Sequence, residues 1–385
     1  MSNTMIYADH AATTALSPGA YAAMQPWLQT QFGNPSTRYS LAREPRKAVA
    51  SARQAIADCI GAKPDEIIFT SGGTEADNWA LTGVAFRQPD FKCEIISSCI
   101  EHHAILHTCD FLKHMGYGIT LLPVDKQGVV NPETLKKHIK DTTRLVSIMF
   151  ANNEIGSIQP IKELAEIAHQ HGCLFHTDAV QCVGHIPIDV QALGIDMLSA
   201  SAHKFNGPKG IGFLYVRDGV SIESFMHGGA QEKGKRAGTE NVAGIIGMAE
   251  ALREHQEHMA EEIEYVSGLA ETLLADLRKT DLDFLVNGSK SRVPGSMSLS
   301  FRGIDGEALM HRLDFKGSEV STGSACDSMR TILSHVLRAI AAPEEYAYGT
   351  IRITLGTDNT MDQMHTLAEQ IYDITSRMQK GGFHL

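Results

Sequence analysis

Short apolar runs alternate with helical patterns along the chain from about Ser17 to Val216. Such runs predict buried strands. The predicted strands are Glu66–Thr70, Cys93–Ser97, Ile119–Pro123, Arg144–Phe150, Cys173–Asp178, Ile195–Ala200 and Gly212–Val216. Amphipathic patterns between most of them predict helices, for example Ile161–Gln170 before Gly172. The alternation predicts an α/β fold with a mainly parallel sheet, which binds ligands at the carboxyl ends of its strands.

The pattern changes after a long helical stretch, Val242–Lys279, which is rich in Glu, Ala, Leu and Met. The later elements predict a smaller α+β unit, with strands at Phe284–Val286, Met297–Phe301 and Ile351–Leu355 and helices at Gly306–Leu313 and Met361–Met378. A chain of 385 residues is long enough for two domains. We expect a large domain over residues 16–258, a small C-terminal domain over 259–385 that carries Cys326, and an N-terminal segment, 1–15, that packs with the small domain.

Composition narrows the class of protein. Hydrophobic residues make up 43% of the chain and the formal net charge is -11, which suits a folded core and disfavours direct nucleic-acid binding. No stretch is apolar enough to span a membrane, and we expect no export signal at the N-terminus. The seven cysteines are scattered, which predicts reduced thiols in the cytoplasm. Six lie in or beside apolar runs, whereas Cys326 lies in the small, polar stretch Ser321–Ser328.

Lys204 follows the predicted strand Ile195–Ala200 and precedes a Gly/Pro turn, in the run Ser199–Gly210. A lysine that is partly desolvated at a strand end can act as an amine nucleophile toward a carbonyl. Pyridoxal phosphate (PLP) is held in this way, as a Schiff base on a lysine with an acidic partner for its ring nitrogen. A single lysine is more often exposed and without such a role. The neighbouring strand ends therefore decide between the two interpretations.

Two other segments offer a phosphate site and a ring acid. In Phe69–Asn78, glycines precede a helix that starts at Thr74, and free N–H groups at a helix start favour a phosphate. Asp178 ends an apolar strand, where a carboxylate needs a donor such as a pyridinium N–H. Gln181, three residues later, could reach the phenolic oxygen of the same ring. Simple helix capping is the alternative for both Thr74 and Asp178.

Three further residues complete the candidate set. Asn153 follows the strand Arg144–Phe150 and could donate to a ring oxygen or a substrate carboxylate, with turn formation as the alternative. Arg352 lies in an alternating strand and suits bidentate carboxylate binding, with a strand-edge salt bridge as the alternative. His102, near a predicted helix start, could stack on a flat ring and transfer protons.

The segment around His102 also raises the question of a metal site. Candidate ligands lie close together in it, at Cys99, His102, His103, His107 and Cys109. Their spacing fits no zinc pattern well, and half of them fall within an amphipathic helix. We therefore expect no resident metal here.

Together these residues are what a PLP enzyme acting on an amino acid requires, and the order of the motifs is recognisable. The chain resembles the cysteine desulfurases of the NifS/IscS type, in the class V aminotransferase group of fold-type I PLP enzymes. The resemblance rests on Tyr7–Thr14, Phe32–Ser36, Thr70–Glu75, Glu101–His102, Asn152–Gly156, Asp178–Gln181, Ser201–Lys204, Gly207–Gly210, Met226–Gly229, Arg236–Thr239, Ser321–Cys326 and Ile351–Arg352. It covers nearly the whole chain and implies a fold-type I transferase architecture.

The resemblance implies a role for each candidate. Lys204 would form the Schiff base, Asp178 would bind the ring nitrogen, Gln181 the phenolic oxygen, and His102 would stack on the ring as acid/base. The phosphate contacts would be Gly73, Thr74, Ser201 and His203, together with Thr239 of the neighbouring subunit in an obligate homodimer. Asn153 and Arg352, with Asn34 beside them, would bind the substrate carboxylate. Cys326 would be the nucleophile that takes sulfur from L-cysteine.

The implied reaction converts L-cysteine to L-alanine and leaves a persulfide on Cys326. A sulfur-acceptor protein, either an iron–sulfur scaffold or a tRNA-thiolation enzyme, would then receive the sulfur, and Cys326 could also ligate an iron–sulfur cluster transiently. The chain departs from the family after Cys326, where Asp327 would raise the pKa of the thiol by like-charge repulsion. We also expect the protein to lack the longer C-terminal tail of the housekeeping members. These departures concern the acceptor rather than the chemistry.

Two other classes of function remain open at this stage. The same fold supports selenocysteine lyases, sulfinate-releasing lyases and aminotransferases, which a substrate panel separates from a desulfurase. A non-catalytic scaffold for sulfur-transfer proteins is the other alternative, and it would bind no PLP. The presence of Lys204, Asp178 and Cys326 argues against the scaffold.

Overall fold

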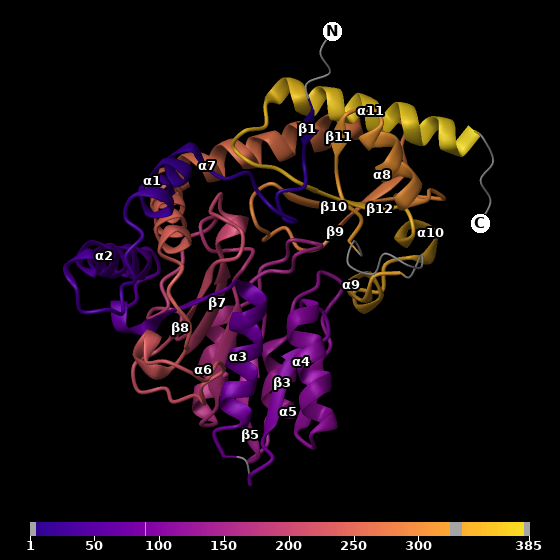
Figure 1. Ribbon diagram of the computed structural model, residues 1–385. Coiled ribbons are helices and arrows are strands. Elements are labelled where there is room, and N and C mark those ends of the chain that lie inside the picture. Colours follow the sequence, from indigo (N-terminus) through magenta and orange to yellow (C-terminus); the bar gives the residue numbers. More distant parts are fainter. Residues whose placement is uncertain (1–4, 89, 324–332, 381–385) are drawn as a thin grey trace.

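A computed structural model of the chain describes residues 5–88, 90–323 and 333–380 (Figure 1). A seven-stranded sheet forms its centre, in the order β2 (Ile67–Thr70), β8 (Gly212–Val216), β7 (Met197–Ser201), β6 (Leu174–Asp178), β5 (Thr143–Ser147), β3 (Glu94–Ser98) and β4 (Gly118–Leu122). All the strands run parallel except β8, which is antiparallel to both of its neighbours. The predicted mainly parallel α/β sheet is confirmed.

Alternation along the strands gives each face of the sheet its own core. On β2, Ile67 packs into one apolar cluster and Ile68 into the other, and on β3 Ile96 and Ile95 divide in the same way. The helices α3 (Gly73–Ala85) and α4 (His103–His114) cover one face, while α2 (Arg43–Cys59), α5 (Pro132–His138) and α6 (Ile161–Gln170) pack on the other. Because side chains of a strand alternate between the faces, continuous apolar runs are needed where both faces are covered.

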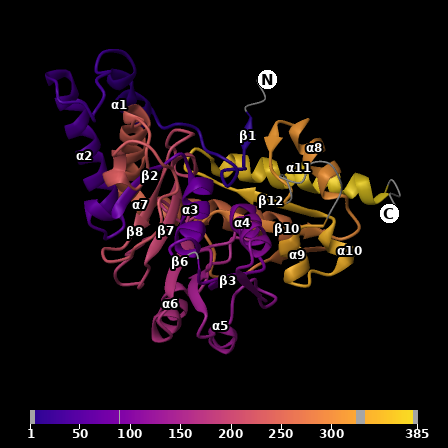
Figure 2. The same ribbon diagram turned by 60° about the horizontal axis from the view of Figure 1, so that its bottom comes forward.

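A smaller unit holds the three-stranded antiparallel sheet β12 (Thr350–Thr354), β10 (Ser296–Phe301) and β9 (Phe284–Asn287). The helices α8 (Gly306–Asp314) and α11 (Met361–Lys380) pack on it, and α9 (His335–Ala339) and α10 (Glu344–Ala347) lie nearby. Figure 2 shows this unit on the opposite side of the large sheet from α1 (Pro18–Gln29) and α2.

The helix α7 (Val242–Arg278) connects the two units. Its first half, including Leu252, belongs to the core of the large sheet, and its second half, from Val266, belongs to the core of the small unit. This change of core supports the proposed division near residue 258. None of the helices in residues 5–88, 90–323 and 333–380 is both long and apolar enough to cross a membrane.

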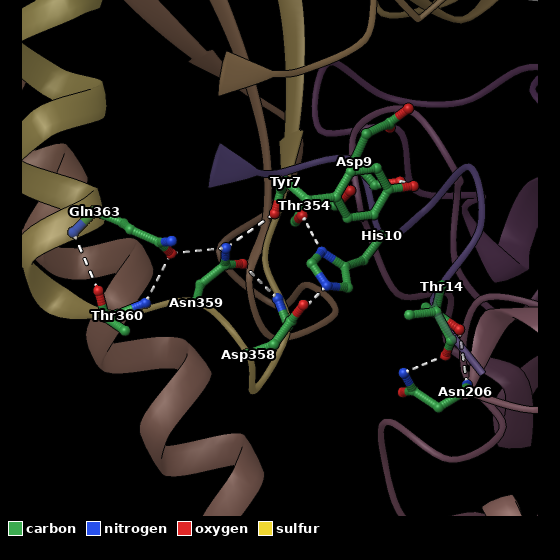
Figure 3. Close-up of polar contacts among 12 residues, drawn as sticks. Tyr7, Asp9, His10, Thr14, Asn206, Thr354, Asp358, Asn359, Thr360 and Gln363 are labelled. Carbon is green, nitrogen blue, oxygen red and sulfur yellow. Dashed lines mark hydrogen bonds and ion pairs between the residues drawn. The ribbon is translucent and has the colours of Figure 1, made fainter. Parts of the chain in front are cut away.

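The N-terminal segment runs from the small unit to the large one. Its strand β1 (Ile6–Tyr7) pairs in parallel with β11 (Ser318–Glu319). Figure 3 shows His10 hydrogen-bonded to Asp358 Oδ1 at 2.8 Å and to the carbonyl oxygen of Thr354 at 3.0 Å. Four residues later, Thr14 Oγ1 accepts the backbone N–H of Asn206 at 2.8 Å. The chain between His10 and Thr14 is therefore held at both ends, where it passes from one unit to the other.

Candidate active site

A cavity of about 220 Å³ lies at the carboxyl ends of the central parallel strands. Nine of the predicted site residues line it, namely Gly73, Thr74, His102, Asn153, Asp178, Gln181, Ser201, His203 and Lys204. The remaining lining residues are Asp77, Met149, Ala151 and Val180. The cavity therefore lies where the strand ends predict it, and Asp77 is a titratable lining residue that the sequence pattern did not indicate.

Lys204 ends a short 3-10 turn, Ala202–Lys204, which directly follows β7. Its Nζ donates to the carbonyl oxygens of Ala11 at 2.5 Å and Ala12 at 2.9 Å. Its own carbonyl oxygen accepts a hydrogen bond from His185 Nε2 at 2.8 Å. The backbone of this lysine is thus fixed, while its ammonium lies at the cavity wall against the N-terminal segment.

One end of the cavity is shaped to receive an anion. The helix α3 begins at Gly73, after Gly72, whose φ of 150° favours glycine. A Cβ added to Gly73 would lie 2.5 Å from Val180 Cγ2, so a larger residue would close this corner of the cavity. Ser201 is buried beside the same turn. Free N–H groups at the start of α3 therefore face a space that only glycines leave open.

His203 lies at this end as well. Burial, together with the positive charges of Lys204 and Lys209, lowers its pKa to about 4. Its Nδ1 is 3.1 Å from Thr13 Oγ1. The ring is therefore neutral at pH 7 and serves as a hydrogen-bonding group at this end of the cavity.

The other end of the cavity is acidic. The side chains of Asp77, His102 and Asp178 bring one oxygen or nitrogen atom each within 4.8 Å of one another. Asp178, the last residue of β6, accepts the backbone N–H of Val180 at 2.9 Å. Burial raises the pKa of both carboxyl groups, and that of Asp77 is raised further by the charge of Asp178. Two carboxyl groups in a dry pocket cannot both be ionised, so the pair holds a proton.

This acidic trio is, within the described part of the chain, the set of side chains able to share a metal ion. The charge of Lys204 acts on both His102 and Asp178, however, and the two carboxyl groups retain a proton between them. Both features disfavour a cation and favour a ligand that offers an N–H to Asp178. The trio does not include the other residues of the Cys99–Cys109 segment.

His102 is fixed by its position at the start of α4. It is the N-cap residue, and its Nδ1 accepts the backbone N–H of Ala104 at 3.2 Å. Burial lowers the pKa of His102, against the opposing effect of the Asp178 charge. The neutral ring therefore carries its proton on Nε2, because Nδ1 is already used as an acceptor.

The preceding residue, Glu101, anchors this turn. It is fully buried, and it accepts hydrogen bonds from Ser98 Oγ at 2.5 Å and from the backbone N–H of Met149 at 3.0 Å. Burial raises the pKa of Glu101 to about 8. The turn that presents His102 is thus tied to the neighbouring strand end.

Four predicted site residues do not line this cavity. Arg352, on β12, donates from Nη2 to Asp9 at 2.6 Å and from Nη1 to the carbonyl oxygen of Asn153 at 3.1 Å. Asn34 accepts the backbone N–H of Ser36 at 2.9 Å in the loop after α1, and Thr239 is exposed shortly before α7. Cys326 lies outside the described residues. The roles of these four residues remain predictions.

Asp77 was missed because its local sequence gives little sign of a function. It lies in the middle of α3, on the same helix face as Thr74 and Leu81 by spacing of three and four residues. The available signal was a carboxylate among buried residues such as Ala76 and Trp79, which predicts either a paired or a neutral acid. Its proximity to Asp178 depends on tertiary packing.

Comparisons with known proteins show which family the chain is similar to. The model of the family described as "Aminotransferase class-V" matches residues 6–367. A cysteine desulfurase IscS of Dictyoglomus turgidum is 50% identical over 375 residues, which cover 97% of this chain and 95% of that protein. A solved NifS-like protein is 36% identical with a TM-score of 0.92, over 97% of this chain and 100% of that one. A structure titled "SspA in complex with cysteine" is 35% identical with a TM-score of 0.82, over 93% of this chain and 100% of that one.

Proposed function

This chain belongs to the class V aminotransferase family, and we propose that within it the protein is a cysteine desulfurase that uses PLP to remove sulfur from L-cysteine. The observation that carries this proposal is one cavity that gathers Lys204, Asp178, His102 and the Gly73–Thr74 turn. These residues supply an amine, an acid for a ring nitrogen, a proton-transfer group and an anion site. This combination matches PLP as the cofactor and an amino acid as the substrate.

The residues of the cavity fit PLP from end to end. The turn at Gly73, with Thr74, Ser201 and His203, would hold the phosphate, in a space that a Cβ at Gly73 would fill. At the other end Asp178 would accept the ring N–H, and Gln181, whose Nε2 now donates to the carbonyl oxygen of Ala11, would reach the phenolic oxygen. When bound, PLP supplies an electron sink that weakens the bonds at the α-carbon of an amino acid.

The chain's own residues orient the reaction and move its protons. Lys204 would hold PLP through its side-chain amine, the nucleophile of the cavity. Its ammonium must first leave the carbonyl oxygens of Ala11 and Ala12. His102, neutral and hydrogen-bonded through Nδ1, keeps its ring face for stacking and Nε2 for proton transfer. Arg352 and Asn153, with Asn34, bind the substrate carboxylate.

Cys326 is the proposed sulfur acceptor. Its thiolate attacks the substrate sulfur, the carbon–sulfur bond breaks, and the electron pair of that bond stays with the carbon skeleton, which takes up a proton and leaves as L-alanine. The six described cysteines support this assignment by exclusion, because burial raises the pKa of every one of them. The pKa of Cys59, for example, is raised to about 11 and that of Cys109 to about 12. None of these six is a thiolate at neutral pH.

A second copy of the chain completes the site in this proposal. Thr239 is exposed and outside the cavity of its own chain, as expected of a residue that contacts the phosphate in a partner subunit.

The outer sulfur of the Cys326 persulfide then passes to an acceptor protein for iron–sulfur cluster assembly or tRNA thiolation. The six described cysteines are free thiols, which is consistent with a cytoplasmic location.

The proposal is tested by measuring alanine and sulfide from L-cysteine with purified protein, PLP and a thiol reductant. We expect the two products in equal amounts, no yellow cofactor and no product with Lys204→Ala, and a yellow but inactive protein with Cys326→Ala. Product formation by Lys204→Ala would refute the proposal, and full activity of Cys326→Ala would remove the role of that residue. Turnover of selenocysteine with negligible cysteine activity would identify the alternative lyase.

A further inference from the structure

Asp77 is a buried carboxyl group at the cavity wall that the proposed reaction does not yet use. It lies in the middle of α3, and the residue is 1% exposed. One of its oxygen atoms lies within 4.8 Å of the polar atoms of Asp178 and His102. Its Oδ1 has no hydrogen-bond partner among the described residues. A polar group buried in this way is costly, so a function is the expected compensation.

Among the described residues, the groups that face Asp77 provide no cation to balance a negative charge. From β6 it meets Asp178 and also His176, whose Nε2 is 3.8 Å away and whose pKa is lowered by burial to about 3. From the turn before α4 it meets Glu101, another carboxyl group, and the neutral ring of His102. From β7 it meets the neutral hydroxyl of Ser199, whose hydrogen bond lowers the pKa of Asp77 against the larger effects of burial and of the Asp178 charge.

The interaction between the two aspartates divides their roles. A hydrogen bond between their side chains raises the pKa of Asp77 further and lowers that of Asp178, against the burial that raises both. Asp178 also accepts the backbone N–H of Val180, which favours its ionised form. Asp77 is therefore the member of the pair that keeps the proton.

We propose that Asp77 is a positioning residue of the cofactor site, which as a neutral acid donates its proton in a hydrogen bond to Asp178 and keeps that carboxylate ionised and aimed into the cavity. The inference rests on the proposed function, because the ring nitrogen that Asp178 serves is that of PLP. In this arrangement Asp178 is ionised and Asp77 is protonated. An ionised Asp178 can then hold the ring nitrogen of PLP protonated.

The side chain at position 77 can be changed so that the hydrogen bond is either kept or lost. Asp77→Asn keeps an N–H donor toward Asp178 without an ionisable proton, and Asp77→Val has a similar volume and no donor. Thr177→Val is the matched control, because Thr177 is a fully buried residue of β6 whose Oγ1 lacks a hydrogen-bond partner in the described structure. It changes a buried polar group beside Asp178 without touching the carboxyl pair.

The first readout is the affinity of each full-length variant for PLP, measured by absorbance titration. Losing a hydrogen bond to a buried charged group weakens an interaction roughly tenfold to a hundredfold. We expect that loss for Asp77→Val, and values within about threefold of the wild type for Asp77→Asn and Thr177→Val. A wild-type affinity for Asp77→Val, or an equal loss for Asp77→Asn, would overturn the inference.

The second readout is the protonation of the ring nitrogen of bound PLP. If Asp77 had only a structural role, its substitution would leave this protonation unchanged. With PLP isotope-labelled at the ring nitrogen, the nitrogen chemical shift should move toward the deprotonated value in Asp77→Val and remain at the wild-type value in Asp77→Asn. An unchanged shift in Asp77→Val would contradict the proposal.

The third readout needs neither activity nor the valine variant. The infrared spectrum of the full-length protein at pH 7, recorded before PLP is added, should contain the carbonyl band of a neutral carboxyl group that Asp77→Asn lacks. Identical spectra would show that Asp77 is ionised and would overturn the inference even if the valine variant did not fold. If the wild-type protein shows this band but binds no PLP, the proposed function is refuted, while the conclusion that Asp77 is protonated still holds.

Discussion

The guanidinium group of Arg352 is held by the carboxylate of Asp9, with 2.6 Å between Arg352 Nη2 and Asp9 Oδ1. The two side chains are 7% and 16% exposed, so solvent screens this pair only weakly. A second hydrogen bond joins Arg352 Nη1 to the carbonyl oxygen of Asn153, a residue of the cavity wall. From the sequence alone, Arg352 could either form a salt bridge or bind the substrate carboxylate. The geometry is compatible with both roles, because Asp9 orients the guanidinium group that the substrate carboxylate would contact.

Removing the Asp9 carboxylate should weaken substrate binding more than it slows the chemical step. Asp9→Ala leaves Arg352 without its orienting acceptor, and we expect the KM for L-cysteine to rise roughly tenfold with a smaller change in kcat. Asp9→Asn keeps an oxygen acceptor, so its KM should fall between those of Asp9→Ala and the wild type. Asp358→Asn, which alters the nearby pair with His10, should leave KM unchanged. Steady-state kinetics that show kcat falling with KM constant would contradict this role.

His102 should be needed for proton transfer but not for retention of the cofactor. Losing a positioned acid/base group typically lowers the rate by about a hundredfold or more, so we expect such a loss of kcat in His102→Gln while the yellow colour remains. Because burial lowers the pKa of His102, the acidic limb of the pH–rate profile that depends on it should lie below the ordinary histidine value of about 6.5. His107→Gln, at an exposed position of the same helix, is the control and should keep the wild-type kcat.

Glu101 should make the protein less stable as pH rises. A buried acid with a raised pKa binds its proton more tightly in the folded state, so stability is lost between the ordinary glutamate pKa of about 4.3 and the folded value of about 8. Over that range the loss approaches about 1.4 kcal/mol per pH unit. Urea unfolding between pH 5 and pH 8 should show a flatter dependence for Glu101→Gln than for the wild type. The exposed control Asp110→Asn should keep the wild-type slope, and an equal slope for Glu101→Gln would exclude the effect.

Thr239 should act across the subunit interface. Lys204→Ala and Thr239→Ala are each expected to be impaired alone, the first without a covalent cofactor and the second with weakened phosphate binding. In a mixed dimer one site regains both Lys204 and Thr239. Random exchange of subunits should therefore restore up to about a quarter of the wild-type activity, as two-fold symmetry requires. Activity after exchange that equals the average of the separate variants would contradict a shared site.

The fold was predictable because local patterns carry most of it. The predicted Gly212–Val216 and Ile161–Gln170 match β8 and α6 residue for residue, and the other predicted elements agree within a few residues. The largest difference is at Arg144–Phe150, where β5 ends at Ser147. Met149 and Phe150 are apolar because they are buried beyond the strand, so their hydrophobicity marks the core rather than the strand.

The site was predictable only as far as strand ends determine it. Asp178 ends one of the central parallel strands, and Lys204 and Asn153 follow the strands on either side of it, so their convergence at the carboxyl ends follows from parallel topology. The pairing of Arg352 with Asp9 joins residues more than 300 positions apart. No local pattern encodes such a contact, because it depends on how the small unit packs against the N-terminal segment.

The destination of sulfur in a single turnover tests the proposed chemistry most directly. The holoenzyme is mixed with less than one equivalent of L-cysteine labelled at sulfur, without reductant, and each cysteine-containing peptide is then analysed. We expect the label as a persulfide on Cys326, in an amount equal to the L-alanine formed, and none on the six other cysteines. Alanine formed with the label on another cysteine, or with no label retained on the protein in the first turnover, would contradict the assignment of Cys326.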